Sequence, residues 1–419
     1  MRRMTNNSLL LRKAPRCGCW VVLLSCFFVA RGPRNVVADT TNDPPLVTIR
    51  SVDADQWVGR LIHFSSDGGV KLRTDSGSDN DIPIRNLLRL SPVSTKSARR
   101  NSDFTLTLSN GDTFLAKNAT IVKESVTLET ADIGAMTLPL ELVSELTTAQ
   151  STVNSHQSSL VWFRGSQPPA EDSILLTNGD TARGFITSLD NDSLAWQSES
   201  GQLSVPLRLV VAIRFSSPRQ PKTPTPSCIV TLHSGGRMTL ANISWVGNDV
   251  QGQFLWGTQV RFEAERIARV DVHGGRWQWL ADLEPTSFVQ TPQLTLNWPL
   301  RKNRNVLNGP LTVAGELYEQ GLGVHGRTVV SYELGGAYRQ FVTSFGLDDD
   351  SGPWADVSVR IVVDGRTRFD QADVRCGRLF GPIRVDVAKA KLLELIVDFG
   401  RNGDMQDRFN WIEPALVRE

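Results

Sequence analysis

A run of three carboxylates is the densest group of chemically versatile side chains in this sequence. Asp348, Asp349 and Asp350 precede a Ser-Gly-Pro-Trp segment that ends at Trp354, a composition typical of a loop. Carboxylate oxygens in such a loop are ligands that Ca²⁺ prefers. Asp side chains that accept hydrogen bonds from backbone amides in a solvated turn would give the same pattern. Both interpretations stay open: a calcium site formed by the three carboxylates, or a turn.

Aromatic and imidazole side chains nearby suggest a second chemistry, sugar recognition, which combines an aromatic face with converging polar groups. Trp354 is expected to be exposed in its loop, whereas Trp411 falls on a predicted strand and could equally be core. His325 lies in Gly-Val-His-Gly, where small neighbours should leave a reachable imidazole that donates and accepts hydrogen bonds. Its ring nitrogens could instead be satisfied internally. Trp277, Trp279 and Trp298 are expected to pack at the entrance to the last domain.

Five segments of the last third carry a family resemblance. They are Gly321–Gly326, Phe345–Asp350, Val363–Gly365, Asp398–Asp404 and Asn410–Leu416. In this order and spacing the sequence resembles the NPCBM family of carbohydrate-binding modules over roughly residues 276–419. The resemblance implies a jelly-roll β-sandwich and a glycan site formed by His325, Trp354, Arg408, Asn410 and Trp411.

One departure from the family pattern concerns the ligand. The family commonly has Asp-His-Ala-Asp-Trp before its final strand, whereas this chain has Arg408 and Asn410 in place of the His and the second Asp. The fold resemblance survives this change, but sugar specificity does not follow from it. A second metal candidate pairs Asp282 with Glu413, because the first and last strands of a jelly roll run side by side. The family usually has Asp where this chain has Glu413.

Signatures of an enzyme are missing from the sequence. It has no Gly-x-Ser-x-Gly turn, phosphate-binding loop or zinc-binding helix motif, and its five histidines are scattered. Cys228 and Cys376 fall in different predicted domains, so free thiols are favoured over a disulfide. We therefore expect a protein without catalytic activity.

The middle of the chain is repetitive. Leu-Ser-Asn-Gly-Asp-Thr at 108–113 recurs as Leu-Thr-Asn-Gly-Asp-Thr at 176–181, and two looser copies flank these. Each copy alternates apolar and polar residues over about 45 positions, and Asn-Gly or Gly-Gly supplies hairpin turns. The order of strands and turns indicates a small five-stranded barrel, weakly similar to Sm-like or SH3-like barrels. One continuous β-sandwich is the alternative.

The predicted fold class is therefore all-β: a C-terminal jelly-roll β-sandwich preceded by about four small β-barrel-like repeats. Polar and proline-rich stretches, clearest at 216–227, place the boundaries. The predicted parts are a signal peptide at 1–38, repeats at 39–93, 103–149, 172–216 and 228–272, and the sandwich at 276–419.

The N-terminus has the pattern of an export signal. Five basic residues within positions 2–16 precede an apolar run, Trp20–Ala30, and small residues lead to a cleavage site at Ala38/Asp39. The run is short for a membrane span, although an uncleaved anchor is the alternative. Cleavage would leave 38 basic and 44 acidic side chains, a formal charge of −6. We therefore expect no nucleic-acid partner and no membrane span after cleavage.

These observations predict an exported, non-catalytic carbohydrate-binding protein that is secreted, periplasmic or on the cell surface. The repeats would act as spacers or as docking surfaces for other surface proteins. The alternatives are an interaction scaffold without sugar binding and, less expected, a glycoside hydrolase with a catalytic domain within 39–272. Exposure of Trp354 and His325 in one groove would favour glycan binding, and burial of both would favour the scaffold.

The export prediction can be checked directly. We expect N-terminal sequencing of the protein recovered from the producing cell to begin at or near Asp39, because the basic and apolar segments match a cleaved signal. A protein that starts at Met1 and stays in the cytoplasm would contradict it.

Overall fold

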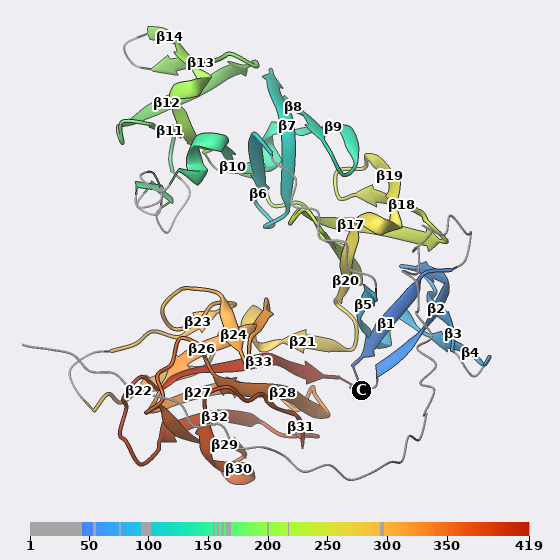
Figure 1. Ribbon diagram of the computed structural model, residues 1–419, viewed down its shortest axis with the longest axis vertical. Helices are drawn as coiled ribbons and strands as arrows, with labels where there is room; N and C mark the ends of the chain where they lie inside the picture. Colours follow the sequence, from blue (N-terminus) through green and yellow to red (C-terminus); the bar gives the residue numbers. More distant parts are fainter. Residues whose placement is uncertain are drawn as a thin grey trace, which may run out of the picture. The chain divides into compact units, whose positions relative to one another are not determined.

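The computed structural model describes residues 44–418 apart from ten short gaps (Figure 1). The gaps are 53–55, 75–76, 94–101, 154–155, 157–158, 161–162, 165–168, 199–200, 217 and 294–296. The predicted signal peptide therefore lies outside the described residues. The described residues form an all-β protein, as the alternating sequence predicts.

Twenty strands form four groups of five, which we call the first to fourth repeats. The first repeat contains β1 (Leu46–Ser51), β2 (Gln56–Ser65), β3 (Gly69–Arg73), β4 (Asp79–Ile82) and β5 (Leu87–Pro92). The second contains β6 (Phe104–Leu108), β7 (Thr113–Val122), β8 (Ser125–Thr130), β9 (Gly134–Pro139) and β10 (Val143–Thr148). The third contains β11 (Asp172–Leu176), β12 (Thr181–Leu189), β13 (Ser193–Ser198), β14 (Gly201–Pro206) and β15 (Val210–Arg214). The fourth contains β16 (Ser227–Leu232), β17 (Arg237–Val246), β18 (Asp249–Phe254), β19 (Gln259–Glu263) and β20 (Ile267–His273).

Each repeat has the same internal plan. The first strand pairs with both the second and the fifth, and a one-turn 3₁₀ helix connects the fourth to the fifth. These helices are η1 (Ile84–Asn86), η2 (Leu140–Leu142), η4 (Leu207–Leu209) and η5 (Ala264–Arg266). The long second strand has a register shift against the third strand in all four repeats, for example between Leu61 and His63 in the first and between Ala116 and Asn118 in the second. Such a bulge bends a strand, so one strand can curve around a small core.

The repeats also pair with one another. The fifth strands pair antiparallel, β5 with β20 and β10 with β15, and the ends of the second strands pair likewise, β2 with β17 and β7 with β12. The first repeat is thus joined to the fourth and the second to the third, within one 20-stranded hydrogen-bonded network. This gives loose support to the predicted barrel-like repeats, with the strands of all four joined in one network and not in a single continuous β-sandwich. The predicted domain boundaries stay predictions.

A buried carboxylate links the second and fourth repeats. Asp112, in the turn of the second repeat, is fully buried and accepts hydrogen bonds from the Thr239 amide (2.9 Å) and the Thr239 hydroxyl (2.7 Å). Burial raises the pKa of Asp112, and its hydrogen bonds oppose that shift. Asp180 occupies the matching position in the third repeat but is exposed and contacts only its own turn. The same motif therefore forms a link between repeats in one copy only.

The C-terminal part is a sandwich of two antiparallel sheets (Figure 1). One sheet contains β21 (Trp277–Trp279), β23 (Arg301–Lys302), β26 (Gly321–His325), β28 (Gln340–Leu347), β31 (Phe380–Asp386) and β33 (Arg408–Val417). The other contains β22 (Ser287–Gln290), β27 (Thr328–Glu333), β29 (Asp356–Val363), β30 (Arg366–Arg375) and β32 (Leu392–Phe399). This part also contains a short hairpin, β24 (Leu311–Val313) with β25 (Glu316–Tyr318), and the 3₁₀ helix η6 (Leu280–Asp282), while a further 3₁₀ helix, η3 (Ala149–Thr152), follows β10.

Alternating apolar residues fill the space between the two sheets. Val357, Val359 and Ile361 of β29 are fully buried, as are Leu393 and Leu395 of β32. Each strand buries every second side chain because successive side chains point to opposite faces. The first strand of the sandwich, β21, pairs with the last, β33, as expected for a jelly roll.

Two smaller expectations can be compared with the structure. Cys228 and Cys376 are free thiols, as predicted. Within the described residues, no helix has the length and apolar character needed to cross a membrane.

Asp112 gives a test of the link between repeats. Asp112→Ala should lower the unfolding free energy of the repeats by about 1–3 kcal/mol, because the buried Thr239 donors lose their acceptor. Denaturant unfolding would measure this, with the exposed Asp180→Ala as matched control. Equal losses in both variants would show that the motif acts only as a turn.

Candidate functional site

Several strand ends place polar loops together at one end of the sandwich. β26 ends at His325 and is hydrogen-bonded to the start of β33 at Arg408. In the facing sheet β32 ends at Phe399 beside Val357 of β29. The loop residues that follow or precede these strands, 291–293, 297–300, 326–327, 348–355 and 400–407, therefore lie at the same end. We call this region the loop end of the sandwich.

Two buried aspartates organise the loop end. The carboxylate of Asp356 accepts backbone hydrogen bonds from Arg401 (3.0 Å) and Asn402 (3.2 Å). Asp407 Oδ1 accepts from the Asp356 amide at 3.1 Å, and the Asp407 carbonyl accepts from the Gly326 amide at 3.1 Å. Gly400 is required here, because a Cβ would lie 2.2 Å from the Asp356 carboxylate. The Asp398–Asp404 segment thus wraps around a buried carboxylate.

Asp407 has an unusual protonation equilibrium. Burial, with additional repulsion from Asp356 and Asp404, raises the pKa of Asp407 to about 8, although its hydrogen bond from the Asp356 amide acts in the opposite direction. The side chain is fully buried, and Oδ2 has no hydrogen-bond partner among the described residues. At neutral pH Asp407 is therefore a protonated carboxyl group inside the loop end.

His325 lies beneath a tryptophan. Its ring stacks on Trp298 with ring centres 5.0 Å apart and planes 9° from parallel. Nδ1 contacts the Gly326 carbonyl at 3.0 Å and must donate there, which leaves Nε2 as an acceptor. Burial lowers the pKa of His325, so the ring is neutral at neutral pH. His325 is only 4% exposed, which corrects the expectation of a reachable imidazole: Trp298 covers it.

The accessible chemistry of the loop end comes from other residues. Trp354 is 63% exposed, and its carbonyl accepts a hydrogen bond from the Asn402 side chain at 2.9 Å. Asp404 and Gln293 exchange two hydrogen bonds of 3.0 Å, each through its own amide and the other's side chain. Trp298 is half-buried. Together these groups offer an aromatic face with amide and carboxylate groups beside it, the combination that sugar hydroxyls and C–H groups require.

Two of the predicted sugar-binding residues belong to the core. Trp411 and Asn410 are fully buried on β33, so neither side chain can reach a ligand, and the prediction is corrected for both. Trp411 packs edge-to-face on Phe345 and Phe409, because the inward positions of a last strand must fill the sandwich core. Arg408 is half-buried and donates to the Asp350 carbonyl, which joins β33 to the carboxylate loop.

The carboxylates of the Asp348–Asp350 loop do not converge on one point but contact different partners. Asp348 is fully buried and accepts from Asn410 Nδ2 (2.6 Å), while Asp349 accepts from the Gly315 amide (2.9 Å). Within the described ranges, no three His, Cys, Asp or Glu side chains form a group that could hold a metal ion. The residues as placed do not fit calcium, so calcium binding by Asp348, Asp349 and Asp350 stays a prediction without geometric support.

The second metal pair is also engaged elsewhere. Glu413 forms ion pairs with Arg89 (2.9 Å) and Arg50 of the first repeat. Burial raises the pKa of Asp282, and the electrostatic interaction with His273 acts in the opposite direction. Asp282 and Glu413 lie near the paired strands β21 and β33, as expected, but the carboxylate of Glu413 neutralises arginines instead.

Sequence reasoning missed Trp298, Gln293 and Asp404 as candidates. The sequence predicts that Trp298 packs at the domain entrance with Trp277 and Trp279. The last two are buried there. Asp404 is the last residue of one of the five resemblance segments, and this was the one available signal. No local pattern indicates that residues 293 and 404, far apart in the sequence, face each other.

Comparisons with known proteins concern mainly the C-terminal part. Residues 276–417 match the NPCBM/NEW2 domain family and form a domain of that family. A CBM51 from Clostridium perfringens GH95, solved with methyl-galactose, is 23% identical and has a TM-score of 0.31, covering 34% of this chain and 99% of that one.

Two further CBM51 structures are similar. CBM51-2 with GlcNAc and the INT domains of C. perfringens ZmpB is 20% identical with a TM-score of 0.31, covering 42% of this chain and 39% of that one. The tandem CBM51 modules of Sp3GH98 from Streptococcus pneumoniae are 12% identical with a TM-score of 0.31, covering 76% and 89%. The comparison with curated proteins found no match.

The buried Asp407 should make the stability of the sandwich depend on pH. Its pKa is about 8 in the folded protein against an ordinary value of 3.8, so the fold loses stability as pH rises through this interval. Asp407→Asn keeps the acceptor for the Asp356 amide and cannot ionise. The melting temperature of the unmodified sandwich should therefore fall more between pH 6 and pH 9 than that of the variant. Parallel profiles would show that Asp407 does not titrate there.

Proposed function

We propose that this is an exported, non-catalytic carbohydrate-binding protein whose NPCBM domain binds a glycan at the loop end of the sandwich. The repeats hold this domain away from the protein's attachment point or present surfaces to other proteins. The proposed location is outside the cytoplasm: the periplasm, the cell surface or the medium. The basic-then-apolar pattern of the first 38 residues supports this location.

The exposed ring of Trp354 is the observation that carries the proposal. The indole is 63% exposed, so its apolar face is open to a ligand. Asn402 fixes the backbone of Trp354, the same loop supplies Asp404, and the loop after β22 supplies its partner Gln293. An aromatic platform with fixed polar neighbours suits a sugar ring, which has an apolar face and hydroxyl edges.

Burial disfavours the charged forms of His325 and Asp407, so both groups beneath the loop end are neutral at neutral pH. The Asp404 carboxylate and the Gln293 amide are the groups of the loop end that can bind sugar hydroxyls. The non-catalytic assignment is supported by the engagement of the buried carboxylates in structural hydrogen bonds, for example Asp356 with the amides of residues 401 and 402.

Replacing the platform tests the proposal. A glycan array on the full chain identifies a ligand, with galactose and GlcNAc as first candidates because the CBM51 neighbours were solved with them. Trp354→Ala should then weaken binding about 5- to 150-fold, equivalent to about 1–3 kcal/mol. The melting temperature should stay nearly unchanged, since the ring is exposed.

Phe185→Ala is the matched control, because Phe185 is 51% exposed on β12 in the third repeat. Calorimetric titration should show unchanged glycan affinity in this variant. His325→Ala is not a suitable probe of contact, because removing a buried ring also removes the support of Trp298. If the unmodified protein binds no glycan on the array, the interaction-scaffold function replaces this one.

A further inference from the structure

The paired repeats create grooves of one recurring design. Each groove lies between the 3₁₀ helix of one repeat and the end of the fifth strand of its paired repeat. In the first pair, η5 of the fourth repeat faces the end of β5. In the second pair, η4 faces the end of β10, and η2 faces the end of β15. We call these the η5, η4 and η2 grooves.

Equivalent hydrogen bonds confirm that the grooves correspond. The residue after each first strand donates its amide to the last residue of the 3₁₀ helix: Ser109 to Leu142, Thr177 to Leu209 and His233 to Arg266. The middle residues of these helices are therefore equivalent. They are Arg85 in η1, Glu141 in η2, Arg208 in η4 and Glu265 in η5.

A segment of the chain itself binds at the η2 groove, whose remaining open volume is about 460 Å³. After β15 the segment 218–220 crosses η2, and the Arg219 amide donates to the Glu141 carbonyl at 2.6 Å. The Arg219 guanidinium pairs with the Glu141 carboxylate at 2.9 Å. Ser109 donates its hydroxyl to the Arg219 carbonyl (2.6 Å), and the Gln220 side chain donates to the Ser109 carbonyl (2.7 Å). An extended Pro-Arg-Gln segment thus fits this design through both backbone and side chain.

A second copy of the same contact appears at η1. After β20 the chain enters the sandwich, and the Arg276 amide donates to the Arg85 carbonyl at 3.0 Å. Gly275 passes so close that a Cβ there would lie 2.8 Å from that carbonyl. Two of the four 3₁₀ helices therefore receive an extended segment on the same carbonyl. This contact is a general property of the repeat pair rather than an accident of one linker.

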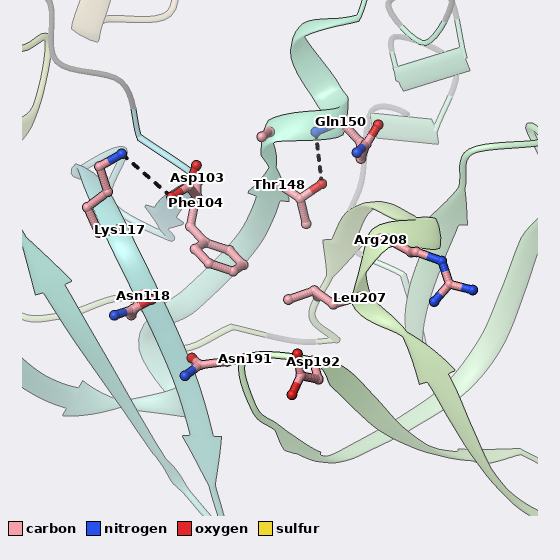
Figure 2. Close-up of a pocket in the computed structure, with 11 residues that line it drawn as sticks. Asp103, Phe104, Lys117, Asn118, Thr148, Gln150, Asn191, Asp192, Leu207 and Arg208 are labelled. Atoms are coloured by element: carbon pink, nitrogen blue, oxygen red, sulfur yellow. Dashed lines mark hydrogen bonds and ion pairs between the residues drawn. The ribbon is translucent and has the colours of Figure 1, made fainter.

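The other two positions lack such a segment among the described residues. In the η4 groove, which has about 460 Å³, the chain after β10 turns into η3 instead of crossing η4 (Figure 2). Arg208 extends from η4 on one side, and Lys117 and Asp103 form an ion pair on the other (Figure 2). The η5 groove has about 500 Å³, and within the described part of the chain no amide donates to the Glu265 carbonyl.

The η5 groove combines the features of the occupied η2 groove. Its middle helix residue is Glu265, the equivalent of Glu141, and this side chain is exposed. Its walls are apolar: Pro45, Pro92, Leu46 and Val93, the last two being 39% and 47% exposed. An apolar wall with an acceptor carbonyl and one carboxylate suits an extended peptide with a proline followed by a basic residue.

We propose that the η5 groove, between the first and fourth repeats, binds an extended Pro-Arg segment of a partner protein, in the way that residues 218–220 occupy the η2 groove. The arginine pairs with Glu265, its amide donates to the Glu265 carbonyl, and the proline packs on the apolar wall. The η4 groove lacks this pairing carboxylate, because Arg208 stands at the position of the acidic residue.

A synthetic peptide tests this proposal on the full chain. The probe is fluorescein-labelled Phe-Ser-Ser-Pro-Arg-Gln-Pro-Lys, the sequence of residues 215–222. Fluorescence anisotropy should show saturable binding with a dissociation constant between about 1 µM and 1 mM. Glu265→Arg should weaken it at least about tenfold at low salt, since attraction becomes repulsion and exposed charges act most strongly there. Arg208→Ala, the matched control in the η4 groove, should leave binding unchanged.

Three results would overturn the proposal. They are no saturable binding, equal binding by Glu265→Arg, and equal binding of a peptide with Glu in place of Arg. A further variant replaces Lys96, Arg99 and Arg100, which lie outside the described residues, with Ser. Binding seen only in that variant would make the chain itself the occupant. Unchanged circular dichroism and melting temperature would show that each variant is folded.

Discussion

The free edge of the fifth strand is the constraint on which the repeat architecture depends. A fifth strand uses one edge to pair with the first strand of its own repeat, and its other edge would expose unpaired amides and carbonyls. Here β5 pairs with β20 over two residues of each strand and β10 with β15 over three, so each pairing covers part of both edges at once. This pairing brings each 3₁₀ helix against a neighbouring strand end. The grooves between repeats are therefore a consequence of edge closure.

The middle residue of the 3₁₀ helix differs in charge from groove to groove, although the backbone arrangement is the same. Glu141, Arg208, Glu265 and Arg85 occupy one structural position and carry both signs. The backbone carbonyl accepts an extended segment both at Glu141 and at Arg85, while the side chain forms an ion pair with the segment at Glu141 only. A repeated scaffold can in this way present sites of different specificity without any change of fold.

The sandwich uses buried carboxylates as its organising groups. The Asp356 carboxylate accepts hydrogen bonds from two backbone amides of the 400–407 loop. The Asp348 carboxylate accepts one from the Asn410 side chain, and Asp407 accepts one from the Asp356 amide. Burying a carboxylate costs folding free energy unless the group is hydrogen-bonded or becomes neutral. Asp356 and Asp348 are hydrogen-bonded, and the raised pKa of Asp407 keeps that group protonated. The loops they fix carry the exposed Trp354, so internal polar contacts determine the geometry of the surface that meets a ligand.

The sequence by itself determined the strands, their repetition and the identity of the C-terminal domain, because period-two alternation and Asn-Gly turns are local signals. It also placed Trp354 in an exposed loop. Only the tertiary structure decided that Trp411 and Asn410 face the core, that Trp298 covers His325, and that Asp112 links two repeats while Asp180 does not. Burial and hydrogen bonding depend on residues hundreds of positions apart, and no local pattern records which strand edges meet.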